Sequence, residues 1–123
     1  AHLRGQPLHA QLTALGARLV AATTTATAYR LWALADTHPP KPGLARVAPG
    51  EPGGAAIVVE TYALTAEAFG RFVATVPPPL VIGNVELADG AWVKGFLCEP
   101  RALVGATEIT AHGGWVRYRA TLG

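Results

Sequence analysis

The hydrophobic positions change their spacing several times along the chain, and each change predicts a new element. In residues 7–15 leucines recur at helical spacing, Pro7 suits the first helical turn, and Gly16 is a natural stop. Residues 17–34 are rich in threonine and in branched or aromatic side chains, and they alternate near their end. This second pattern predicts one or two strands after the first helix.

The middle of the chain predicts a long loop, a strand and a helix. Residues 35–54 are rich in proline and glycine and read as a loop with a short strand at 44–47. Residues 55–64 are almost wholly apolar, which predicts a strand buried on both faces. Residues 65–76 predict a helix capped by Thr65. Its expected core stripe consists of Phe69, Phe72, Val73 and Val76.

The stretch VIGNVELADGAWVKGFLCEP, residues 81–100, predicts a β-hairpin with Asp89 and Gly90 as a two-residue loop. In that register Asn84 and Glu86 share one face, and Lys94 lies on the other. The first face would also carry Ile82, Val93, Gly95 and Leu97, and the second Val85, Trp92 and Phe96. A single bulged residue would reverse the assignment, so either a site floor or the solvated side of a sheet fits these polar groups.

Helices and strands are interspersed, no βαβ unit is repeated, and the last residues predict a short helix or mixed segment. The expected class is therefore α+β, with a mixed or barrel-like sheet and short flanking helices. At 123 residues the chain is long enough for a single domain, 1–123, with one hydrophobic core.

Composition narrows the function classes. Half of the residues are hydrophobic and 15% are charged, which excludes intrinsic disorder. The net charge is +2, and the basic residues form no run, so no nucleic-acid partner is expected. No apolar run approaches the ~20 residues that span a bilayer, so no membrane partner is expected either. The single Cys98 suits a reducing, cytoplasmic setting. Because the chain contains no methionine, we expect it to be a piece of a larger polypeptide.

Two residues near the start and in the proline-rich loop are candidates for chemistry. If a strand precedes it, His2 lies on a strand-to-helix turn, where an imidazole can transfer protons close to backbone N–H groups. The alternative is a frayed terminal histidine. Lys41 stands between prolines in PPKPGL, next to the adaptable Gly43, and would suit a carboxylate. The alternative is an exposed loop lysine.

Two polar residues lie within apolar strands. Glu60 is a half-buried carboxylate candidate that would need a partner, or else a glutamate that faces water on an edge strand. Tyr29 lies in the alternating segment that precedes the loop. The four histidines lie far apart in sequence, so a metal site is not expected.

At this point the sequence resembles a known family. The stretches HLRGQPLH, GARLVAATTTATAYRLWAL, PPKPGL, AIVVETYALTAEAFGRFV, VPPPLVIGNVELADGAWVKGFLCEP and ATEITAHGGW follow one another as in the C-terminal domain of allophanate hydrolase. The resemblance implies a γ-glutamylcyclotransferase-like fold, a barrel with flanking helices. It also implies an apolar strand before the Ala-His-Leu, which this sequence lacks.

The resemblance further implies a role in urea degradation. An amidase domain of the same polypeptide would release N-carboxycarbamate, and this domain would decarboxylate that small dicarboxylate without a cofactor. His2 would handle the proton, Lys41 and Tyr29 would contact carboxylates, and Gly5 and Gly43 would shape the loops. Glu86 would add an orienting or relay group.

Two other functions stay open. The intermediate also decarboxylates spontaneously, so the domain could instead be a structural or oligomerisation module of the amidase. A cyclotransferase is disfavoured, because the region where that family carries its catalytic glutamate reads Val-Pro-Pro-Pro in residues 76–79.

Overall fold

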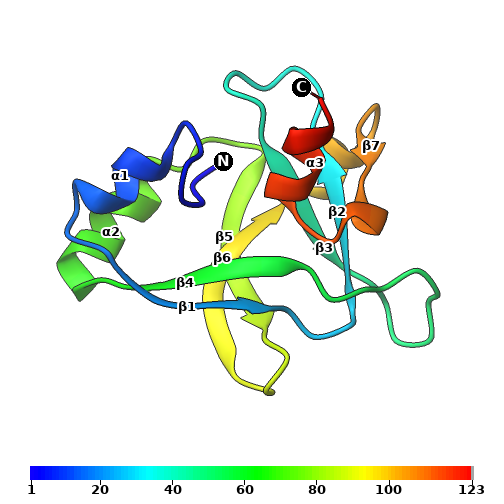
Figure 1. The fold of residues 1–123 in the computed structure, drawn as a ribbon, viewed down its shortest axis with the longest axis horizontal. Helices are drawn as coiled ribbons and strands as arrows, with labels where there is room; N and C mark the ends of the chain where they lie inside the picture. The colour runs from blue at the N-terminus through cyan, green and yellow to red at the C-terminus, as the bar shows by residue number, and fades with distance from the viewer. Residues whose placement is uncertain (123) are drawn as a thin grey trace.

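The structure is a computed structural model that describes residues 1–122. Short helices flank small sheets, as Figure 1 shows. The helices are α1 His9–Thr13, α2 Ala66–Ala74 and α3 Trp115–Thr121, with 3₁₀ turns η1 Pro100–Leu103 and η2 Thr110–His112. The strands are β1 Arg18–Thr24, β2 Tyr29–Ala33, β3 Pro42–Arg46, β4 Val58–Ala63, β5 Leu80–Glu86, β6 Trp92–Cys98 and β7 Thr107–Glu108. No helix within residues 1–122 is long and apolar enough to cross a membrane.

The strands form three separate antiparallel sheets, β1–β4, β3–β2–β7 and β5–β6. The predicted α+β class is confirmed, but residues 1–122 do not close a barrel. Single bridges, Thr25 to Leu87 and Tyr29 to Ala55, link the sheets. The barrel stays open because β4 and β5 each have a hydrogen-bonded strand neighbour on one side only, within the described chain.

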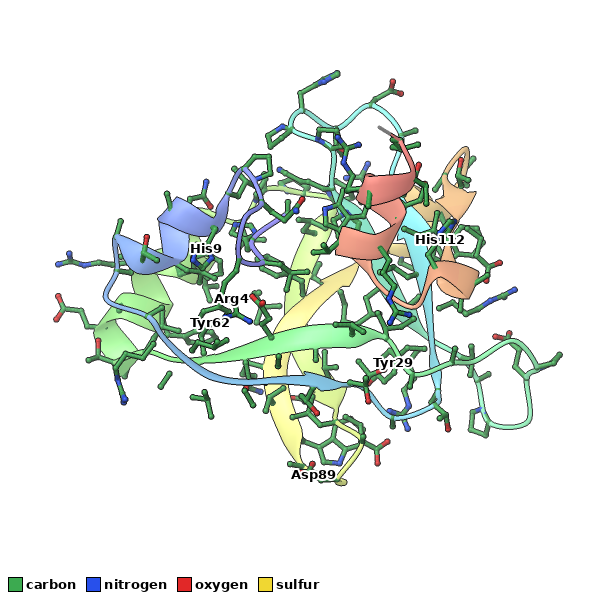
Figure 2. All side chains as sticks on the ribbon, in the orientation of Figure 1. Arg4, His9, Tyr29, Tyr62, Asp89 and His112 are labelled. Atoms are coloured by element: carbon green, nitrogen blue, oxygen red, sulfur yellow. The ribbon has the colours of Figure 1, made fainter. Side chains whose placement is uncertain are left out.

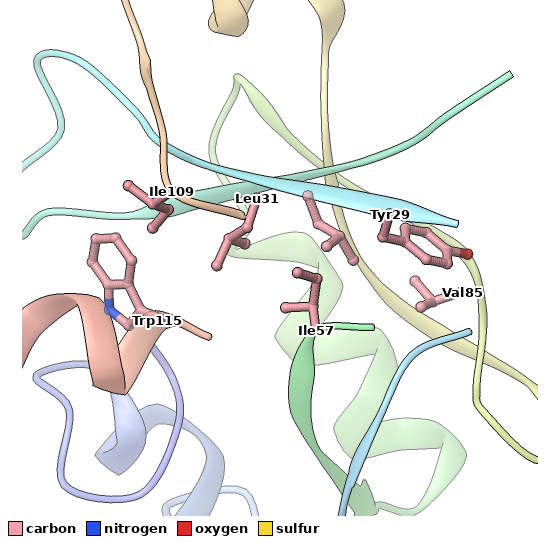
Figure 3. Packing of buried hydrophobic residues seen from close by; sticks show 7 residues of the cluster. Tyr29, Leu31, Ile57, Val85, Ile109 and Trp115 are labelled. Atoms are coloured by element: carbon pink, nitrogen blue, oxygen red, sulfur yellow. The ribbon is translucent and has the colours of Figure 1, made fainter. Parts of the chain in front are cut away.

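A single hydrophobic cluster lies where the three sheets meet. Alternation along β2 turns Tyr29 and Leu31 inward, where they are 0% and 4% exposed. Figure 3 shows these two side chains packing with the other members of the cluster. Those members are Leu44, Ile57, Val85, Ile109 and Trp115. Each large side chain contributes roughly 1.5–3 kcal/mol by leaving water, so this cluster is the main source of stability.

The two predicted helices form, with shorter bounds. Thr65 caps α2 as expected, since its hydroxyl accepts a hydrogen bond from the Ala68 backbone N–H at 3.1 Å. Of the expected stripe, Phe72 is buried, but Val73 is 37% exposed and was wrongly assigned to the core. The helix follows the end of β4 and lies at the edge of the molecule, so a narrow face suffices to bury it (Figure 1).

Two strand predictions were wrong. The apolar strand β4 is not buried on both faces, because it belongs to a two-stranded sheet and its Val58 is 42% exposed. The hairpin loop has three residues, 88–90, instead of two: Leu87 N–H donates to the Ala91 carbonyl, and Gly90 has a φ of +88°. The register therefore shifts by one residue and pairs Asn84 with Lys94.

The shift changes which side chains share a face. Asn84, Glu86 and Lys94 all lie on one face of the hairpin, and the Lys94 Nζ donates to Asn84 Oδ1 at 2.7 Å. The sequence-based placement of Lys94 on the opposite face is thus corrected. A glycine in the left-handed region supplies the extra loop residue, and sequence alternation alone does not reveal that residue.

Candidate functional site

A hollow of about 440 Å³ lies between the N-terminal loop, β4 and the β5–β6 hairpin. Most of the side chains that line it are apolar. The polar side chains at its wall are His2, Lys41, Glu60, Thr61, Tyr62 and Lys94. A mostly apolar hollow with a few convergent polar groups is typical of a ligand site, so its polar end is the candidate site.

His2 is held by its ring and by one nitrogen. Its imidazole stacks on Phe96 at 4.9 Å between centroids and meets the edge of Phe72 at 5.3 Å. Its Nε2 lies 2.8 Å from Gln11 Oε1 on α1. Because an amide oxygen only accepts hydrogen bonds, this contact assigns the proton of the neutral ring to Nε2 and leaves Nδ1 available. His2 is therefore an ordered, half-buried residue and not a frayed end.

The surroundings of His2 favour its neutral form. Burial is the main cause that lowers its pKa, and the positive charge of Lys41 acts in the same direction. The hydrogen bond with Gln11 opposes both effects. The lowered pKa means that the neutral imidazole predominates at neutral pH and that the imidazolium forms as the pH falls.

Lys41 also lines the hollow, and it lies on the proline-rich segment that leads into β3. Its backbone is fixed at both ends of the peptide unit: its N–H donates to Thr37 Oγ1 at 3.0 Å, and its carbonyl accepts from the Leu34 N–H at 3.0 Å. The flanking prolines further restrict the backbone. Lys41 is thus half-buried in an ordered loop, beside His2, and is not a freely exposed lysine.

The other predicted site residues lie elsewhere. Tyr29 is fully buried, and its hydroxyl accepts from the Glu86 backbone N–H at 2.9 Å and from Arg46 Nη1 at 3.1 Å. The Glu86 carboxylate pairs with Arg46 at 2.8 Å. Figure 2 shows Tyr29 apart from the group formed by Arg4, His9 and Tyr62. The structure brings His2 and Lys41 together, and it gathers Tyr29 and Glu86 in a second cluster around Arg46.

The two predicted glycines have separate roles. Gly5 has a φ of +77°, so it can form the turn after His2 at a conformation that other residues rarely adopt. Gly43 lies in β3 against two side chains, and a Cβ there would come within 2.7 Å of Leu34 and 2.9 Å of Cys98. Neither glycine lines the hollow; Gly5 shapes the loop that carries His2, and Gly43 lets β3 pack closely.

Sequence reasoning did not single out Thr61 and Tyr62, and it described two other polar groups at the hollow incompletely. Lys94 was placed on the other side of the hairpin, because the extra loop residue was not anticipated. Glu60 was recognised as a half-buried carboxylate, but its partners were not: its oxygens accept from Arg4 and from the Tyr62 hydroxyl. The Glu60 side chain is 11% exposed. Arg4 is too far away in sequence for spacing to have revealed the pair.

Within residues 1–122, no group of three or more histidine, cysteine, aspartate or glutamate side chains is arranged to hold a metal ion. The polar atoms of the site are thus imidazole, ammonium, hydroxyl and carboxylate groups. Such groups can bind an anion and move a proton.

The sequence of the chain is similar to a known protein family and to known proteins. Residues 1–120 match the family described as "Allophanate hydrolase C-terminal domain". The chain is 45% identical to a urea amidolyase of Lachancea kluyveri and 44% identical to that of Saccharomyces cerevisiae, over 96% of its own length. It spans 6% of the length of these two relatives.

Solved structures show the same likeness. The allophanate hydrolase of Kluyveromyces lactis is 41% identical and superposes with a TM-score of 0.94, over 100% of this chain and 20% of that one. A uropathogenic E. coli-specific protein is 34% identical with a TM-score of 0.86, and the match covers 97% of this chain and 89% of that one. The sequence, the fold and these matches together show that the chain belongs to the allophanate hydrolase C-terminal domain family.

Proposed function

We propose that this protein decarboxylates N-carboxycarbamate as the C-terminal domain of an allophanate hydrolase. The observation that carries the proposal is that His2 and Lys41, which come from separate segments, line the same hollow. N-Carboxycarbamate carries two carboxylates on one nitrogen. An ammonium group suits one carboxylate, and an imidazole suits the proton that the nitrogen must receive.

The proposed step is balanced by one proton. The bond between nitrogen and the departing carboxyl carbon breaks, and its electron pair takes a proton from the His2 imidazolium. The products are carbon dioxide and carbamate, which goes on to ammonia and a second carbon dioxide. His2 then regains its proton from water. No metal or organic cofactor takes part, because a protonated nitrogen is an adequate leaving group.

The wall of the hollow favours the loss of one carboxylate over the other. Lys41 would bind the carboxylate that stays, while apolar side chains surround the one that leaves. A carboxylate in apolar surroundings is poorly solvated, whereas the neutral carbon dioxide that it becomes is not penalised there. Tyr29 and Glu86 would contribute indirectly. The bond between the Tyr29 hydroxyl and the Glu86 N–H fixes the end of β5, and the neighbouring Val85 and Leu87 line the hollow.

The apolar part of the hollow suggests what precedes this segment in a longer polypeptide. All residues from 57 to 62 line it. Because successive side chains of a strand point to opposite faces, consecutive lining residues place the hollow along the free edge of β4. We propose that an apolar strand before Ala1 lies there, as the family resemblance implies. It would bring the three sheets towards a γ-glutamylcyclotransferase-like barrel and leave the polar end near His2 as the site.

The proposed partner is an amidase domain of the same polypeptide. It would generate N-carboxycarbamate, and both would act in a cytoplasmic urea-degrading enzyme. Residues 1–123 would form one domain of that enzyme. The names of the relatives, urea amidolyase and allophanate hydrolase, support this placement.

The test supplies the domain with N-carboxycarbamate from a separate amidase domain and follows carbon dioxide release above the spontaneous rate. We expect His2→Ala to reduce that excess rate by ~10²–10⁴-fold, the range for loss of a general acid. Lys41→Ala should chiefly raise KM, because it removes a charge that binds substrate. His38→Ala, an exposed histidine outside the hollow, is the matched control. Rates unchanged by His2→Ala and Lys41→Ala would overturn the site.

A structural or oligomerisation module is the second candidate. Several large apolar side chains are exposed, including Val20 at 66%, Trp92 at 56% and Val104 at 83%. Exposed apolar side chains suit contacts with another domain or another copy. Under this alternative, carbon dioxide release would equal the spontaneous rate, and light scattering would show association with the amidase domain or with itself.

A further inference from the structure

The N-terminal segment, residues 1–17, is a self-contained unit that carries His2. It is closed by its own hydrogen bonds: the Leu8 N–H donates to the Ala1 carbonyl at 3.0 Å, and His9 Nδ1 lies 3.1 Å from the His2 carbonyl. Because carbonyl oxygens only accept, His9 Nδ1 is the donor in that contact. These bonds make the loop and α1 move together, so the position of His2 depends on how the unit is attached.

A single side chain attaches this unit to the sheets by hydrogen bonds. Among the hydrogen bonds of residues 1–122, those that join segment 1–17 to the rest of the chain all end on Glu60 of β4. The Arg4 backbone N–H donates to Glu60 Oε1 at 2.9 Å, and Arg4 Nε donates to Oε2 at 3.0 Å. Packing also attaches the unit: the His2 ring lies against Phe72 and Phe96, and Leu3 packs against the core cluster. The His9 ring lies 6.0 Å from the ring of Tyr62.

The Glu60 carboxylate is well suited to act as a clamp. It accepts a third hydrogen bond at 2.6 Å from the Tyr62 hydroxyl, so both of its oxygens are occupied. Burial alone would raise the Glu60 pKa, but the bonds from Tyr62 and Arg4 outweigh it and lower the pKa. Burial and the same carboxylate raise the pKa of Tyr62 to about 12. At neutral pH the cluster therefore contains a charged glutamate and a neutral tyrosine.

We infer that Glu60 is a positioning residue for His2: it clamps Arg4, two residues after His2, and so fixes where the imidazole lies in the hollow. Gln11 also contacts His2, but it is exposed to water and belongs to the same segment 1–17. It therefore cannot fix that segment to the sheets, whereas Glu60 of β4 can. The inference rests on the proposed function only in that His2 is taken as the proton donor.

Loosening the clamp should have two separate effects. His2 would leave its place between Phe72 and Phe96, so its pKa should rise towards the usual value of about 6.5. The charged or titratable side chains that face His2 are Lys41 and His9, and both are unchanged in the experiment. A displacement of about 1 Å at a reacting group lowers the rate by on the order of 10²-fold. Substrate binding by Lys41 should change little.

The experiment compares Glu60→Gln with Glu67→Gln. The second variant removes the same charge from an exposed pair with Arg71, in which Glu67 is 76% exposed. Nitrogen chemical shifts of His2, followed over pH, report its pKa and tautomer without any need for activity. Circular dichroism checks that each variant is folded. Turnover of N-carboxycarbamate then gives kcat and KM.

For Glu60→Gln we expect the His2 pKa to rise and kcat to fall about 10–100-fold, with KM within about two-fold of the parent. Glu67→Gln should leave all three unchanged. Arg4→Ala removes the side-chain bond to Glu60 and keeps the backbone bond. It should therefore raise the His2 pKa by less than Glu60→Gln does. If Glu60→Gln does not fold, the titration of His2 in Arg4→Ala tests the positioning role. An unchanged His2 titration in folded Glu60→Gln, or in Arg4→Ala where only that variant folds, would overturn the inference. Absence of turnover in the parent protein would overturn the proposed function instead and leave the titration to decide the role of Glu60.

Discussion

Replacing Tyr29 by phenylalanine separates a structural role of this residue from a substrate contact. The family resemblance assigns Tyr29 to the substrate, but its side chain is 0% exposed and its hydroxyl is already engaged by Glu86 N–H and Arg46. The substitution keeps the ring and removes the shared acceptor. The buried ring packing is therefore unchanged, and the effect reports the hydroxyl alone.

The expected cost follows from the groups left without a partner. The Glu86 N–H, at the end of β5, loses its acceptor, and a buried unsatisfied donor costs about 1–3 kcal/mol. Arg46 loses one bond but keeps its pair with Glu86 at 2.8 Å and its place over the Tyr29 and Trp92 rings. Its share should thus be small. We expect the free energy of unfolding to fall by about 1–3 kcal/mol, and the melting temperature to fall by roughly 4–12 °C.

Urea denaturation followed by tryptophan fluorescence measures this change. Tyr118→Phe is the matched control, because within residues 1–122 no hydrogen bond of the Tyr118 hydroxyl is formed and its ring packs beside Trp115. The control should change the free energy of unfolding by less than ~0.5 kcal/mol. If Tyr29→Phe is equally mild but raises KM, the hydroxyl contacts substrate and the structural account is refuted.

Three further outcomes can be measured. Because proton donation requires the imidazolium of His2, whose pKa is lowered mainly by burial, kcat/KM should fall as pH rises through a value below about 6.5; a limb at higher pH would contradict this. Gly43→Ala should lower the free energy of unfolding by about 1–3 kcal/mol, because the new Cβ would clash with the side chains of Leu34 and Cys98. An unchanged melting temperature would show that these two side chains move aside at little cost. The pKa of Glu60 is raised by burial but lowered further by its hydrogen bonds, so its contribution to stability is present above pH ~4.3 and lost as pH falls through its folded pKa. The stability difference between the parent and Glu60→Gln should accordingly shrink in acid.

The elements whose signals are local were predictable from the sequence. Thr65 begins α2 because its hydroxyl caps an N–H three residues later, and that preference needs no tertiary contact. The alternating residues of β2 likewise place Tyr29 and Leu31 in the core. The extra residue of the hairpin loop was not predictable in the same way. Asp-Gly suits both a two-residue and a three-residue loop. The three-residue loop places Lys94 on the face of Asn84 and Glu86, whereas a two-residue loop would place it on the opposite face.

Burial was harder to predict, because it depends on neighbours that the local pattern does not name. The apolar run of β4 reads as a strand covered on both faces, yet within the described residues β4 has β1 as its one strand neighbour. The same residues line the hollow along its free edge. An apolar run thus predicts that residues form a strand, but it does not show how many neighbours cover that strand.

The candidate site shows the same division between local and distant signals. His2 and Lys41 were proposed from their local settings and from the family resemblance, and both line the hollow. Glu60 and Arg4 form the attachment of the His2 loop, but they are 56 residues apart, and neither has a local pattern that names the other. A residue that acts through position is recognised by its partners, and partners come from the fold. If Glu60 positions His2 as inferred, its role depends on the hydrogen bonds with Arg4, and only the fold reveals that partner.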